Sequence, residues 1–82
     1  MMKAKIEQLL AEAFVPDFLE VIDESRKHAG HAGASQGGHY RVILVAKSFK
    51  GMKPLEIHRL IYQALAPVKS SIHALAIKAS SP

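Results

Sequence analysis

The sequence predicts an α+β domain in which a three-stranded mixed sheet carries helices on one face, with the element order α-β-β-α-β. Two segments repeat their apolar residues with the spacing of amphipathic helices. Three other segments are short and rich in the apolar residues typical of strands. The second helical segment lies between the last two strands, and it is long enough to connect them in parallel.

The first segment is helical because its apolar residues recur at i, i+3, i+4, i+7 and i+8. These residues are Ile6, Leu9, Leu10, Ala13 and Phe14. Pro16 disfavours helical backbone geometry at the preceding residue, so the helix is expected to end near Val15.

The segment "DFLEVIDES" predicts a short strand around the β-branched residues Val21 and Ile22. The following stretch, "RKHAGHAGASQGGH", holds four glycines and three histidines and has no core stripe. We expect a mobile loop there, near residues 27–38. The loop connects the first strand to a second, antiparallel strand.

The alternating segment "YRVILVAK" is the clearest strand of the sequence. One set of its side chains is expected to face the helices and the other to face away. The first set is Tyr40, Val42, Leu44 and Ala46, and the second is Arg41, Ile43, Val45 and Lys47. The turn that follows contains Gly51, which can adopt unusual backbone angles.

The second helix is predicted to begin at Pro54, a residue suited to the first turn of a helix. Its buried stripe is Ile57, Leu60, Ile61, Ala64, Leu65 and Val68. Pro67 is expected to end or distort the last turn. The final strand runs from Ser70 to Lys78.

The composition narrows the possible functions. The 82 residues predict one domain over residues 1–82, with a net charge of +4 and no cysteine. No nucleophile–base pattern, catalytic carboxylate pair or phosphate loop is present, so we expect no enzymatic activity. The longest apolar run, "VILVA", is too short to cross a bilayer, and we expect a soluble, intracellular protein.

The chain has five histidines, which are its main concentration of chemistry. His73 is expected on the same strand face as Leu75 and Ile77, at the edge of the covered face. It is either a functional group or a partly buried histidine that hydrogen-bonds a carbonyl. The histidines of the loop region, His28, His31 and His39, are either metal ligands or solvated side chains.

Five sequence blocks resemble the BolA family in order and spacing. They are "FLEVIDES", "HYRVILV", the F-x-G of Phe49 to Gly51, "HRLIYQAL" and "IHALAIK". The resemblance covers the chain from about Lys3 to Ala79. It implies a fold similar to type II KH domains, with an additional short helical turn.

The resemblance also implies a function. BolA-like proteins bind monothiol glutaredoxins and share a bridging [2Fe-2S] cluster with them. His73 matches the family's ligand in the last strand, and His28 matches the ligand in the loop, with His31 as an alternative. Since this chain lacks cysteine, the thiolate ligands are expected from the glutaredoxin and its glutathione.

A second implied function is that of a DNA-binding transcriptional regulator connected with stress response and cell shape. By this analogy, the DNA-binding surface involves Lys50, Lys53, His58 and Arg59, at and before the second helix. The positive net charge tolerates such an anionic partner. For either function we expect a cytoplasmic protein.

Overall fold

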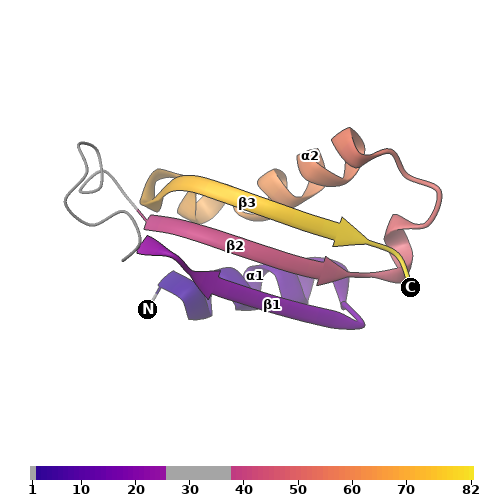
Figure 1. The fold of residues 1–82 in the computed structure, drawn as a ribbon, viewed down its shortest axis with the longest axis horizontal. Helices are drawn as coiled ribbons and strands as arrows, with labels where there is room; N and C mark the ends of the chain where they lie inside the picture. Colours follow the sequence, from indigo (N-terminus) through magenta and orange to yellow (C-terminus); the bar gives the residue numbers. More distant parts are fainter. Residues whose placement is uncertain (1, 26–37) are drawn as a thin grey trace.

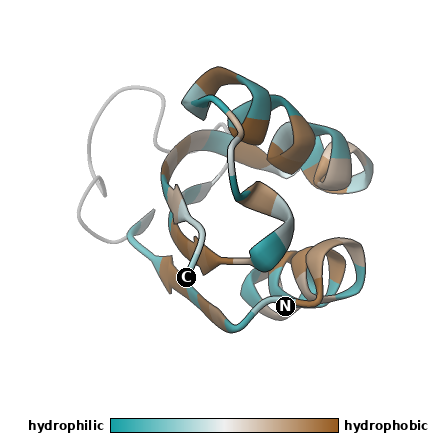
Figure 2. Ribbon diagram, turned by 90° about the vertical axis from the view of Figure 1, so that its right-hand side faces the viewer, coloured by the Kyte–Doolittle hydropathy of each residue, from teal (hydrophilic) through white to brown (hydrophobic). Residues whose placement is uncertain are grey.

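The computed structural model describes residues 2–25 and 38–82. Its elements are α1 (Met2–Phe14), β1 (Phe18–Asp23), β2 (Gly38–Val45), α2 (Pro54–Ala64) and β3 (Ile72–Ser80), with the 3₁₀ turns η3 (Lys47–Phe49) and η4 (Ala66–Ser71). The sheet has the order β1-β2-β3. β2 pairs antiparallel with β1 and parallel with β3. Both helices lie on one side of this sheet (Figures 1 and 2), which confirms the predicted fold class.

Helix α1 packs through one side, as its apolar spacing predicts. Ile6 and Leu10 are fully buried, and the half-buried ring of Phe14 lies 5.1 Å from that of Phe49, measured between centroids. Ala13 is exposed, so the predicted stripe was too wide by this residue. The helix ends at Phe14, just before Val15, which takes a positive φ of 44° ahead of Pro16.

Strand β2 runs through the centre of the sheet and separates its two sides. The residues predicted to face the helices, Tyr40, Val42, Leu44 and Ala46, are all buried. Their neighbours in the chain are exposed or half-buried on the other side. After η3 the chain turns at Gly51, whose φ of 78° lies in the left-handed region that favours glycine.

Helix α2 begins where the sequence predicts. Pro54 occupies its first turn, and the backbone N–H of Lys53 donates to Glu56 Oε1 at 2.9 Å. The buried residues of this region are Ile57, Ile61, Leu65 and Val68. Leu60 is 37% exposed, so its assignment to the buried stripe was wrong. The helix ends at Ala64, before Pro67, and the chain continues as η4.

Strand β3 contains an irregularity that the sequence did not reveal. Gly38 pairs with Ile72, but the next residue, His39, pairs with Ala74, so His73 is an extra residue in a β-bulge. Ile72 therefore packs against the core on the same side as Leu75. The expectation that His73 shares a face with Leu75 and Ile77 was wrong, because it assumed unbroken alternation.

Residues 26–37 lie outside the described part of the chain, and so does nearly all of the predicted mobile loop. Within residues 2–25 and 38–82, no helix is long and apolar enough to cross a membrane.

Candidate functional site

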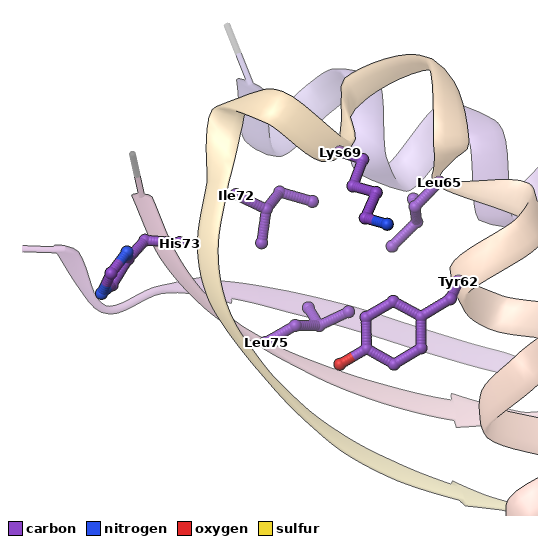
Figure 3. Close-up of a pocket in the computed structure, with 6 residues that line it drawn as sticks. All are labelled: Tyr62, Leu65, Lys69, Ile72, His73 and Leu75. Carbon is purple, nitrogen blue, oxygen red and sulfur yellow. The ribbon is translucent and has the colours of Figure 1, made fainter. Parts of the chain in front are cut away.

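Two histidines meet on the open side of the sheet, opposite the helices. The rings of His39 and His73 lie 5.0 Å apart between centroids, with an interplanar angle of 51°. His39 faces the open side because it precedes the buried residue Tyr40 in β2. His73 is exposed, and its imidazole points away from the packed residues around Tyr62 (Figure 3). The bulge thus turns a strand histidine toward the open side.

The end of β1 holds the backbone of this site in place. The N–H of His39 donates to the Ser25 hydroxyl at 3.1 Å, and the N–H of Glu24 donates to the His39 carbonyl at 2.7 Å. The N–H of Ser25 in turn donates to the Asp23 carboxylate at 2.9 Å. These bonds fix the start of β2 against the end of β1, so the backbone at His39 has a defined position.

Tyr40 supports the same corner from the packed side. Burial raises the pKa of its phenol above the ordinary value of 10.0, the Asp23 carboxylate raises it further, and a hydrogen bond with the Ser25 side chain partly offsets the rise. The phenol also lies against Gly38, where an added Cβ would meet Tyr40 Oη at 2.7 Å. Glycine therefore lets the ring lie across the start of β2.

Next to the histidines, the open side of the sheet carries an ion pair and a hollow. Arg41 Nε donates to Glu24 Oε2 at 3.1 Å, which joins β2 to β1. A hollow of about 240 Å³ lies beside His39 and is lined by Glu24, Ala74 and Ala76 among others. The small alanine side chains leave room there for a group from another molecule.

The imidazoles of His39 and His73 are suitable metal ligands, and the exposed side chain of His73 can be reached by a partner. The described residues contain no group of three or more His, Cys, Asp or Glu side chains that could hold a metal ion. The chain also has no cysteine.

The residues predicted for DNA contact lie elsewhere. Lys50, Lys53 and Arg59 are exposed and His58 is half-buried. Lys50 borders a hollow with Ser81 and Pro82, beyond the carboxyl end of β3. His73 lies at the other end of this strand, so the two predicted sites are at opposite ends of the molecule (Figure 1).

The sequence interpretation missed the pairing of His39 with His73 and left His39 among the loop histidines. The available signal was that both histidines stand at the start of a strand, and parallel strands bring their starts together. Alternation alone places them on different faces, and the bulge overrides it. His28 and His31, predicted as loop ligands, lie outside the described residues.

The comparisons identify the family. The family model described as "BolA-like protein" matches residues 10–82. The chain is 44% identical over 78 residues to the "DNA-binding transcriptional regulator BolA" of Escherichia coli, covering 94% of this chain and 72% of that protein. It is 43% identical over 81 residues to the mouse "BolA-like protein 1", covering 98% of this chain and 55% of the mouse protein.

Solved structures agree with this result. The BolA domain of SufE1 from Arabidopsis thaliana superposes with a TM-score of 0.84 at 38% identity, covering 99% of this chain and 92% of that one. The solution structure of mouse BolA1 gives a TM-score of 0.80 at 43% identity, covering 98% and 64%. The chain belongs to the BolA family. Because this is a non-enzymatic family, the expectation of no catalytic activity is confirmed.

Proposed function

We propose that this BolA-like chain is an adaptor that binds a monothiol glutaredoxin and shares a bridging [2Fe-2S] cluster with it, for cluster handling or iron sensing. The observation that carries the proposal is the exposed imidazole of His73, which the β-bulge turns to the open side beside His39. A histidine with a packing role alone has no need to leave the covered face.

The cluster supplies iron that accepts imidazole nitrogen in place of thiolate, as in Rieske centres, and this substitution alters its redox potential. In this proposal His73 is the fixed ligand, because the residues on both sides of it, Ile72 and Ala74, pair with β2. Protonation also releases an imidazole from iron, which suits a cluster that is transferred to another protein. The cysteine-free chain leaves the thiolate ligands to the glutaredoxin and its glutathione.

The second ligand is a histidine close to the end of β1. His28 is our first choice and His31 the alternative, both from the family resemblance. His28 follows Ser25 by three residues in the sequence. His39 joins these candidates because its ring already lies against that of His73.

The test mixes the purified chain with a monothiol glutaredoxin, ferrous iron, sulfide and glutathione, and records visible absorption and circular dichroism. We expect a spectrum that differs from that of the glutaredoxin cluster alone. His73→Ala should abolish this difference while the free chain keeps its far-ultraviolet spectrum. Single and paired alanine changes at His28, His31 and His39 then identify the second ligand.

His58→Ala is the matched control, because this histidine is half-buried on α2 and lies outside the site. It should leave the mixed spectrum unchanged. A His73→Ala protein that folds and still gives the wild-type spectrum would show that His73 is not a cluster ligand.

A second candidate function is duplex DNA binding, and we place either role in the cytoplasm. Two observations favour it. Lys50, Lys53 and Arg59 are all exposed around the start of α2, and the Escherichia coli relative carries the name of a DNA-binding regulator. If these side chains contact phosphates, affinity should fall steeply with added salt.

The DNA proposal is tested by replacing Lys50, Lys53 and Arg59 with alanine together. The slope of log affinity against log salt should then flatten by up to roughly 2.7, about 0.9 for each lost phosphate contact. The control replaces Lys3, Lys5 and Lys78, which are also exposed and carry the same total charge. An equal change in both triple variants would show only a general charge effect and would reject α2 as the contact surface.

A further inference from the structure

An apolar pocket of about 190 Å³ lies between α2 and β3, on the packed side of the sheet. Its lining includes Tyr62 and Leu65 from α2 and the turn after it, and Ile72 and Leu75 from β3. His73 also belongs to the lining, but its imidazole points away from the space on which the other side chains converge (Figure 3). The pocket is smaller than the roughly 300–1,000 Å³ of sites that enclose whole small-molecule ligands. Its size suits a single apolar side chain.

The pocket adjoins a free strand edge. β3 is the terminal strand of the sheet, so one row of its backbone N–H and C=O groups has no strand partner within the described residues. Such an edge pairs readily with an added strand. Lys78 is the only charged residue in Ile72–Ser80, so the strand has little charge to prevent pairing. Figures 1 and 2 show α2 on the packed side of the sheet near β3, so an added strand would extend the sheet next to the pocket.

The positive charge around the pocket indicates which kind of ligand it binds. All seven acidic residues of the chain precede Ile57, whereas residues 57–82 contain Arg59, Lys69 and Lys78. Lys69 belongs to the lining of the pocket, and its ammonium points toward the other lining side chains (Figure 3). One cation beside one apolar pocket matches a residue that has both an apolar side chain and a carboxylate. The last residue of a polypeptide has both.

We propose that the free edge of β3 and the adjoining pocket bind the C-terminal tail of a partner protein as an added antiparallel strand. The last apolar side chain enters the pocket, and the terminal carboxylate pairs with Lys69. The antiparallel direction follows from the position of the pocket at the start of β3, because the preceding residues of the tail then run toward Ser80. The pocket adjoins the His39–His73 pair, because His73 belongs to its lining, and the binding of a tail goes beyond the cluster function.

The probe is a fluorescein-labelled hexapeptide, Thr-Val-Thr-Val-Thr-Leu, with a free carboxylate, titrated with the full chain by fluorescence anisotropy. We expect saturable binding that weakens roughly threefold to fivefold when the peptide is amidated, as for an exposed ion pair. Lys69→Met should weaken the free acid by the same factor and leave the amidated peptide unchanged. Lys50→Met, an exposed lysine at the other end of the molecule, should change neither affinity.

Strand addition is tested by placing proline at the fourth position of the peptide, which removes backbone pairing and should abolish binding. Amide chemical shifts should move in β3 and at Tyr62, and not in β1. The proposal is overturned if the shifts follow β1, or if 4-methylpentanoate displaces the probe at equal concentration. It is also overturned if the β3 shifts depend on protein concentration without peptide, because a second copy of the chain would then occupy the edge.

Discussion

The two sides of the sheet use the same three strands for different purposes. The packed side carries a continuous core, in which Val42 and Leu44 are fully buried beneath the helices. The open side carries a histidine pair, an ion pair and a hollow beside small alanines. Successive residues of β2 point to opposite sides of the sheet, so one residue packs in the core and the next faces the open side.

The comparison also explains why β3 is irregular. Without the bulge, Ile72 and His73 would exchange sides, and the strand would lose an apolar contact at its start. The extra residue keeps Ile72 against the core and exposes His73. Adjacent positions of β3 therefore face the core and the open side.

The largest expected difference between the sides is in stability. Leu44→Ala removes a fully buried side chain and should lower the free energy of unfolding by about 2–5 kcal/mol. Ile43→Ala, its half-buried neighbour on the open side, should cost about 1 kcal/mol. Urea denaturation of both variants measures the difference. Equal costs would show that the open side is covered in solution.

The second-largest loss of stability is expected at the start of β2, where the two sides of the sheet meet. Gly38→Ala places a Cβ against the Tyr40 ring, and the strain should cost about 1–3 kcal/mol of unfolding free energy. The same change in a Tyr40→Leu background should cost less, because the phenol is gone. If both backgrounds show the same loss, the cost comes from the backbone and not from the ring.

Tyr40→Phe should have a smaller effect at neutral pH, about 1 kcal/mol from the lost hydrogen bond. Its clearer signature is at high pH. The raised phenol pKa means that the folded state holds this proton more tightly than the unfolded state does. The wild type therefore keeps this stability below about pH 10 and loses it as pH rises through the folded pKa.

Urea unfolding between pH 8 and pH 11 measures this signature. The Tyr40→Phe protein should lose less stability than the wild type across that range. Tyr62→Phe is the control, because this ring is 48% exposed. If Tyr40→Phe follows the wild-type curve, the phenol does not contribute to the alkaline loss.

The smallest effect is expected for the ion pair of the open side. Arg41 and Glu24 are 48% and 13% exposed, and water screens their attraction. A double-mutant cycle with Arg41→Met and Glu24→Gln should give a coupling of about 0.5 kcal/mol that shrinks with added salt. A coupling of several kcal/mol, insensitive to salt, would place the pair in a dry interface.

Much of the fold could be predicted because its signals are local. The spacing of Ile6 and Leu10 marks the buried side of α1, and alternation in β2 assigns Tyr40 to the packed side. Ala13 and Leu60 were wrongly predicted to be buried, because the buried stripe of each helix is narrower than its apolar spacing suggests. That width depends on how closely the neighbouring elements approach, and the chain's own periodicity does not contain this information.

The sequence by itself determined the order of elements, the sides of β2 and the family likeness, and it led us to propose His73 as a ligand. Only the tertiary structure decided which way His73 points and that His39 is its neighbour. The physical reason is that a β-bulge depends on the register between two strands that are far apart in the chain. Packing of Ile72 against the core selects that register, and the direction of His73 follows from it.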